Sequence, residues 1–317
     1  MTDALGRRSS HERQSTSKRL RLSERDLLWL EKLHQHGPLP TSYLLAYTDA
    51  LRASEKRQKE RLGDLFHEDN TEHGGAYLDR APQQYATLKA GYNQLVHQVA
   101  PAGLKALKDA GLLHEIGGHY GPWVHRHMVA CITASIELAT LQRPDVSFIP
   151  QHQVLERAKT TLSWPVRVKD ATSDQLVRKD LIPDALFGLI YHTHHGDRFR
   201  FYVVEADRGT EPVSSHNWNR KSFERHLAQY KAYVAGEAYK EHLKLTANVL
   251  VLNVVPDAGR LELMRRQTEK QLGSCSYQLF QTFSEFAAPW RPPEPNHALL
   301  AGAWLRVGYS DFLIDGV

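Results

Sequence analysis

Two stretches of sequence decide how the second half of the chain folds: Leu-Ile-Pro-Asp-Ala at residues 181–185 and Phe-Tyr-Val-Val-Glu-Ala-Asp at residues 201–207. Apolar residues follow Asp184 and precede Glu205, which predicts two strands joined by a short turn. Because a hairpin brings its open ends together, Asp184 and Glu205 are expected to lie side by side. Asp207 would project to the same face as Glu205, since side chains alternate along a strand.

Three neighbouring carboxylates repel one another unless a cation lies between them. Their hard oxygen ligands suit Mg²⁺ or Mn²⁺, so we expect Asp184 and Glu205 to be metal ligands. Such a metal activates water and stabilises the transition state of phosphodiester cleavage. The helix that follows adds cationic candidates, and the predicted catalytic set is Asp184, Glu205, Asp207, His226 and Lys231. The alternative is that Asp184 and Glu205 are ordinary residues at strand ends.

Around this hairpin the pattern predicts an α/β layer. Residues 247–255 are almost continuously apolar, as expected for a strand buried on both faces. Helices are predicted at residues 126–141, 222–239 and 259–271, and further strands at 148–150, 164–168, 185–191, 198–205 and 277–283.

The first part of the chain predicts three short helices. Ser23 and Asp26 have the spacing of a capping box, and the helix that they begin ends at Gly37-Pro38. Thr41 would cap a second helix to residue 47, and Ser54 a third to about residue 66. A turn and strand at 74–79 would form a wing, followed by a helix from residue 92 to 113. This order resembles a winged helix-turn-helix, which would place the third helix in the major groove of DNA.

Positive charge gathers where such a domain would meet DNA. The third helix carries Lys56, Arg57, Lys59 and Arg61, and the preceding arm carries Arg19 and Arg21. We predict that these side chains bind double-stranded DNA. The alternative is a helical bundle whose cations are merely solvated. We divide the chain into a flexible basic tail (1–22), a winged helix-turn-helix domain (23–122) and an α/β domain (123–317), which is α+β as a whole.

Composition limits the classes of protein. The chain has 317 residues, of which 41% are hydrophobic and 24% charged, with a formal net charge of +4 and 18 histidines. These values are typical of a globular protein and permit nucleic acid as a partner. We found no apolar run long enough to cross a membrane and no signal peptide. Cys131 and Cys275 alone make no disulfide framework, so we expect a cytoplasmic protein without a membrane partner.

The spacing of Pro183-Asp184 and Glu205-Ala206-Asp207 resembles the PD-(D/E)XK nucleases, with Asp207 in the place of the motif's lysine. Some members of that fold carry the lysine on the next helix, where Lys221 or Lys231 would be its equivalent. The stretches at 182–187 and 205–210, with the Leu227-x-x-Tyr230 helix, resemble the replication-relaxation family of plasmids and mobile elements.

This resemblance implies DNA binding in plasmid replication, relaxation or mobilisation, with a degenerate nuclease-like domain. His226 stands where the family often has a lysine, which favours degeneracy. One alternative is an active Mg²⁺-dependent DNA endonuclease. Another is a regulatory or scaffold protein whose winged helix binds a protein. Because helix-turn-helix proteins often bind DNA as two-fold dimers, a homodimer or another DNA-processing protein is the expected partner.

Overall fold

The computed structural model describes residues 9–51, 54–85, 93–115, 121–169, 176–215, 220–287 and 291–316. The protein is α+β, as predicted, and contains a seven-stranded mixed sheet. It divides into two compact units, which are described separately: the first holds Met1–Ala134 and Arg291–Pro295, the second Ser135–Trp290 and Asn296–Val317. The division falls within the long helix α5 (Trp123–Thr140).

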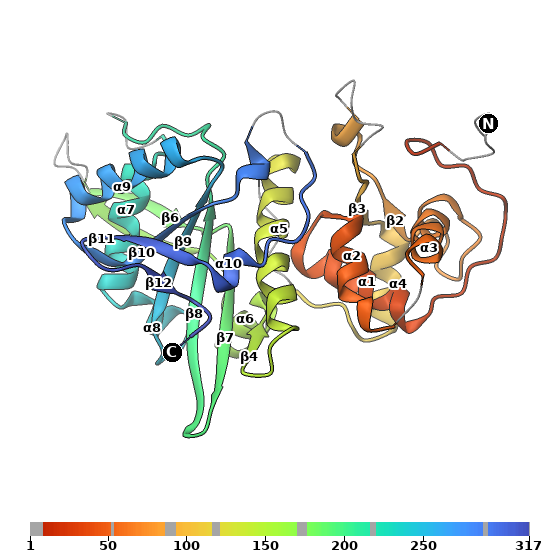
Figure 1. The fold of residues 1–317 in the computed structure, drawn as a ribbon, viewed down its shortest axis with the longest axis horizontal. Helices are drawn as coiled ribbons and strands as arrows, with labels where there is room; N and C mark the ends of the chain where they lie inside the picture. The colour runs from red at the N-terminus through yellow and green to blue at the C-terminus, as the bar shows by residue number, and fades with distance from the viewer. Residues whose placement is uncertain are drawn as a thin grey trace. The chain divides into compact units, whose positions relative to one another are not determined.

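The first unit packs helices on a small antiparallel sheet with the strand order β1-β3-β2 (Figure 1). Its core includes the fully buried side chains of Trp29, Leu30, Tyr43 and Leu65. The elements in chain order are α1 (Glu24–His36), β1 (Leu39–Pro40), α2 (Thr41–Tyr47), η1 (Asp49–Leu51), α3 (Glu55–His67), β2 (Leu78–Asp79), η2 (Pro82–Tyr85), β3 (Val96–Val99) and α4 (Pro101–Asp109).

The predicted starts of the first and third helices are confirmed. Ser23 and Asp26 form a reciprocal capping box at α1, and the Ser54 hydroxyl accepts a hydrogen bond from the backbone N–H of Arg57 at α3. The predicted cap of the second helix is wrong, because Thr41 lies inside α2 after Pro40. Its hydroxyl donates instead to the carbonyl of Leu95 at 3.1 Å, which joins α2 to the small sheet.

The helix predicted from residue 92 to 113 is wrong before residue 101. Residues 96–99 form β3, the central strand of the small sheet, and α4 begins only at Pro101. Proline has no backbone N–H and disfavours the helical conformation in the residue before it, so it suits the first turn of a helix and not its middle. The strand at the end of 74–79 is β2, which pairs with β3.

Residues 9–22 differ from the expected flexible tail, because they pack on the first unit. Leu20 is only 1% exposed, and its backbone N–H donates to the carbonyl of Asn70. The fully buried carboxylate of Glu68 accepts hydrogen bonds from the hydroxyl and backbone N–H of Thr16. The arm therefore supplies the donors and apolar contact that the buried ends of α3 and β2 need.

The second unit is built on a mixed sheet with the order β12-β11-β10-β9-β8-β7-β4. Strands β8, β9 and β10 are parallel, and the other neighbouring pairs are antiparallel. Helices α7 and α9 share a core cluster with β9 and β10. The elements are β4 (Val146–Ile149), α6 (Gln151–Ala158), β5 (Trp164–Lys169), β6 (Leu176–Leu181), β7 (Ala185–Thr193), β8 (Gly196–Ala206), α7 (Phe223–Tyr230), η4 (Lys231–Ala235), α8 (Ala238–His242), β9 (Val249–Val255), α9 (Ala258–Leu272), β10 (Cys275–Thr282), η5 (Ser284–Phe286), α10 (Ala298–Ala301), β11 (Ala303–Val307) and β12 (Phe312–Leu313).

The predicted hairpin is confirmed as β7 and β8, in which Ala185 pairs with Val204 (Figure 1). The long helix predicted over 222–239 is interrupted. A π-helical turn, η4, follows α7, and Glu237 takes a left-handed conformation with φ of 57° before α8. Tyr230, Tyr233 and Val234, which have the spacing of one helical face, all lie in one core cluster.

Candidate functional sites

The first half of α3 is an exposed stretch of helix that carries cations. Lys56, Arg57 and Lys59 are all exposed, as predicted for a DNA-contacting helix. Lys59 forms an ion pair with Glu55 at 2.5 Å on the same helix. The side chains of Lys56 and Arg57 make no ion pair or hydrogen bond with any residue that the structure describes.

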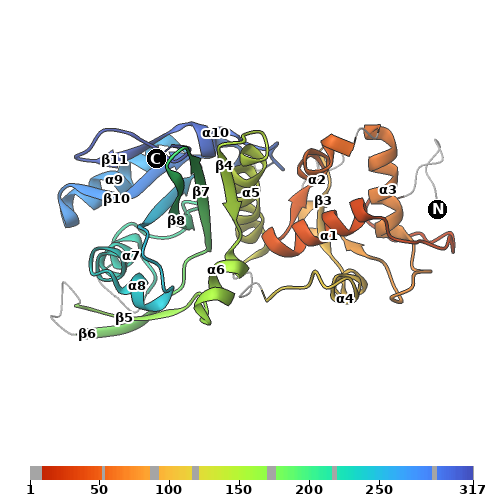
Figure 2. The same cartoon turned by 90° about the horizontal axis from the view of Figure 1, so that it is seen from below.

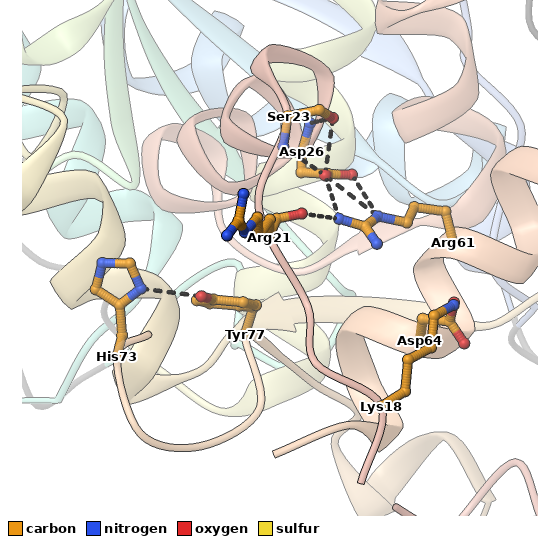
Figure 3. A network of polar contacts seen from close by, with 8 residues as sticks. All are labelled: Lys18, Arg21, Ser23, Asp26, Arg61, Asp64, His73 and Tyr77. Carbon is orange, nitrogen blue, oxygen red and sulfur yellow. Dashed lines mark hydrogen bonds and ion pairs between the residues drawn. The ribbon is translucent and has the colours of Figure 1, made fainter. Parts of the chain in front are cut away.

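Arg61 occupies a different environment from the other three cations. Its Nη2 lies 2.7 Å from a carboxylate oxygen of Asp26, and its Nε donates to the same carboxylate (Figure 3). Burial alone would lower the pKa of Arg61, but the carboxylate of Asp26 outweighs burial and raises it. Arg61 therefore joins α3 to the start of α1. Its side chain does not project from α3 as the side chain of a groove contact would.

The arm brings two further cations to the same side of α3. Arg61 donates to the backbone carbonyl of Arg21, and Lys18 pairs with Asp64 at 2.7 Å (Figure 3). The side chains of Arg19 and Arg21 are exposed. The contact with Arg61 places the main-chain carbonyl of Arg21, and not its guanidinium, at α3.

The second candidate site is the carboxylate pair at the open end of the β7–β8 hairpin. The backbone N–H of Asp184 donates to Val204 at 3.0 Å, and its Oδ2 accepts from the N–H of Ala206 at 2.8 Å. These two bonds extend the hairpin by one residue and place Asp184 opposite Glu205. The predicted adjacency of the two acids therefore follows from strand register.

Glu205 is 8% exposed and faces α7. The Tyr230 hydroxyl donates to its Oε1, and the Nδ1 of His226 lies 3.7 Å from its Oε2. Burial raises the pKa of Glu205 well above its usual range, and the charge of Asp184 raises it further. Burial, with the charges of Lys221 and Arg225, lowers the pKa of His226 to about 3. His226 is thus neutral at pH 7 and does not offset the carboxylate charge.

Lys221, and not Lys231, is the lysine that interacts with the pair. Burial would lower the pKa of Lys221, but the charges of Glu205, Asp184 and Glu211 outweigh it and raise that pKa. Its Nζ also lies 3.1 Å from a carboxylate oxygen of Glu211, and its side chain is 45% exposed. Lys231 is exposed in η4 and makes no ion pair with either acid among the described residues.

Asp207 is held away from the pair by a partner on α9. Its two carboxylate oxygens accept from Nε and Nη2 of Arg260, at 3.2 and 2.5 Å. No cluster of three or more His, Cys, Asp or Glu side chains suited to a metal ion occurs within the described ranges. The predicted three-carboxylate site is therefore reduced to the pair Asp184 and Glu205.

The sequence missed the roles of Tyr230 and Arg260. Tyr230 lies four residues after His226, so both fall on one face of the helix, and this spacing was a usable signal. Arg260 lies 53 residues from its partner Asp207, and no local pattern links the two.

Residues 30–249 match the family model described as replication-relaxation. The chain belongs to the replication-relaxation family. The matched span includes α3 and the carboxylate pair, and membership supports a role in replication or relaxation. Comparisons with curated proteins and with solved structures gave no match. None of the helices in the described part of the chain is long and apolar enough to cross a membrane.

Proposed function

We propose that this replication-relaxation family protein binds double-stranded DNA during replication, relaxation or mobilisation of plasmids or other mobile elements. The first unit would bind as a winged helix, with α3 in the major groove. The observation that carries the proposal is the exposed first half of α3, where Lys56 and Arg57 have no acidic partner among the described residues.

The positive charges of Lys56 and Arg57 are not neutralised by any carboxylate among the described residues. Cations that already pair with carboxylates gain little from a phosphate, whereas Lys56 and Arg57 lose no such partner on binding. Each phosphate neutralised on a duplex contributes a slope of about 0.9 in the logarithm of affinity against the logarithm of salt. Arg61, which pairs with Asp26, supports the helix and contributes to binding through that support.

The test is fluorescence anisotropy of a labelled duplex over a range of salt concentrations. Lys56→Gln/Arg57→Gln should weaken binding and lower the salt slope by roughly 2. The matched control is Lys105→Gln/Lys108→Gln, which removes two exposed cations from α4 in the same unit and should leave the slope unchanged. Equal binding by both double variants would refute the role of α3. A wild-type protein that binds no duplex at low salt would favour a protein partner for the winged helix.

We propose further that the second unit binds DNA without cutting it. Asp207 is committed to Arg260, His226 is neutral, and one oxygen of Glu205 is bound to Tyr230. These contacts leave fewer oxygen ligands for a metal than the three carboxylates suggested. A nuclease-like site in this state is degenerate.

A second candidate function, Mg²⁺-dependent DNA cleavage, is favoured by the place of Lys221. Two adjacent carboxylates fit Mg²⁺, which commonly takes one or two from a protein and fills its other positions with water and phosphate oxygens. When bound, the ion would lower the pKa of a water and stabilise charge on phosphate. Asp184 and Glu205 would hold it, and Lys221 would offset the charge of the phosphate.

Incubation with supercoiled plasmid and Mn²⁺ separates the two functions. Nicking that is lost in Asp184→Ala and in Lys221→Met, with DNA binding retained, would establish the enzyme. The absence of nicking at any Mn²⁺ or Mg²⁺ concentration, in protein that binds the plasmid, would establish the degenerate domain.

A further inference from the structure

The β5–β6 hairpin of the second unit has one buried and one exposed face. Val166 and Val168 point inward and join the core cluster that contains Tyr230 and Tyr233. Pro165, Arg167 and Lys169 point outward from β5, and Leu176, Arg178 and Asp180 point outward from β6. Figure 2 shows the hairpin on the outer side of α7 and α8.

The outward face pairs two like charges. Arg167 lies directly opposite Arg178, and both side chains are exposed. Residues paired in this way have Cβ atoms about 5 Å apart, and like charges there destabilise the sheet. Neither guanidinium makes an ion pair or hydrogen bond with any residue in the described ranges. Among the described residues of the hairpin, the one outward carboxylate is that of Asp180, which accepts a hydrogen bond from Ser163.

A pair of opposed arginines is a poor choice for stability and a good one for binding a shared anion. The planar guanidinium presents parallel N–H donors that match phosphate oxygens, and two of them can hold one phosphate from both sides. The joining residues 170–175, which contain Asp170 and Asp174, lie outside the described residues, and Arg167 and Arg178 belong to the two paired strands.

The hairpin is anchored next to the carboxylate pair. Strand β6 ends at Leu181, three residues before Asp184. The side-chain amide of Gln229, the residue before Tyr230, donates to the backbone carbonyls of Lys179 and Asp180. Arg178 is six residues from Asp184, a span of at most about 20 Å in extended chain.

We propose that the outward face of the β5–β6 hairpin is a phosphate-binding surface for DNA, made by Arg167 and Arg178. This proposal rests on the proposed function of DNA binding and adds a second contact region, in the second unit. Two-stranded ribbons are an established way to present side chains to DNA. The opposed arginines favour a phosphodiester backbone, whose charges recur at short intervals, over an acidic protein surface.

The test uses the full chain and anisotropy with two probes, a labelled duplex and a labelled single strand. Arg167→Gln/Arg178→Gln should weaken binding of whichever DNA probe the hairpin contacts. The expected loss is roughly tenfold for each arginine at about 0.1 M salt. Loss with the duplex alone would assign the surface to double-stranded DNA, and loss with the single strand would assign it to unwound DNA. Arg167→Lys/Arg178→Lys keeps the charges and should retain most of the binding.

Stability provides the control for folding. Removal of one of two opposed like charges should leave Tm equal or raise it, so weaker binding in Arg167→Gln would not come from unfolding. Arg266→Gln removes a 72%-exposed arginine from α9 in the same unit and should change neither binding nor salt slope.

Two results would overturn the proposal. The first is unchanged affinity and salt slope in the double glutamine variant with both probes. The second is that the double glutamine variant loses binding to an acidic protein but still binds both DNA probes as the wild type does. If the α3 variants lose binding while the hairpin variants keep it, the proposed function stands and this inference fails. If no DNA binds to the wild-type protein, both fail.

Discussion

Replacement of Asp26 by alanine is expected to destabilise the first unit by about 3 kcal/mol. Asp26 is 0% exposed, and its carboxylate accepts hydrogen bonds from the backbone N–H and the hydroxyl of Ser23, both at 2.8 Å (Figure 3). Loss of that cap costs about 1 kcal/mol. Loss of one partner of a buried ion pair costs ~3–5 kcal/mol. Since the Arg61 side chain is 19% exposed, water recovers part of this cost, and about 2 kcal/mol remains.

Hydrogen–deuterium exchange measures this loss in the first unit alone. A change of 3 kcal/mol corresponds to roughly a 150-fold fall in the protection of peptides from α1 and α3. Glu24→Ala, an exposed acid in the same first turn, is the matched control and should change protection little. Arg61→Ala should reproduce most of the loss, and the double variant should lose less than the sum of the two. Protection in Asp26→Ala within threefold of wild type would refute the assignment of Arg61 to support of the fold.

Three further outcomes follow from burial and packing. Leu20→Ala should cost ~2–5 kcal/mol, because the side chain is 1% exposed, and exchange in the arm should rise; unchanged exchange would return the arm to a solvated tail. Gly103→Ala should lower Tm, since an added Cβ would lie 2.5 Å from the carbonyl oxygen of Tyr77; an unchanged Tm would contradict the close approach of α4 to that backbone. Burial lowers the pKa of His226 to about 3, so between about pH 6.5 and pH 3 the imidazole is protonated in the unfolded chain and neutral in the folded chain. The stability that His226 gives above pH 6.5 is thus lost as pH falls toward 3, and His226→Gln should lose less between pH 7 and 4.5 in urea titrations; equal losses would contradict the burial of the neutral ring.

The sequence predicted those parts of the fold whose signals are local. Side-chain caps at Ser23 and Ser54 lie within three residues of the donors that they accept from, and the apolar runs of β7 and β8 belong to each strand alone. Strand β3 was missed because its four residues are strand-forming mainly through the partners β1 and β2 on either side. Helix α6 and strand β6 were missed for a similar reason, since each buries only a few side chains against distant elements.

The candidate sites divide in the same way. Asp184 and Glu205 were placed together correctly because a hairpin fixes its own register. The ion pair of Arg61 could not be foreseen, because its partner, Asp26, lies 35 residues away on another helix. Asp207 was assigned to the acidic site on the assumption that β8 continues, but the strand ends at Ala206 and the side chain of Asp207 pairs with Arg260 on α9. Charge alone indicated which residues were candidates, and long-range pairing decided which of them remained available.

The charge balance around Glu205 explains how one lysine separates the two functions considered for the second unit. Glu205 lies beside Asp184, and burial raises the pKa of Glu205, so the pair retains a proton or depends on the positive charge of Lys221. Nearly half of the Lys221 side chain is in water, at 45% exposure, so a DNA phosphate competes with the acids for it. If Lys221 turned to a DNA phosphate, the pair would need either a proton or a divalent cation in its place. A proton would fit the proposed domain that only binds DNA, whereas a metal ion would fit the alternative that cuts it, so nicking assays at several pH values and metal concentrations separate the two.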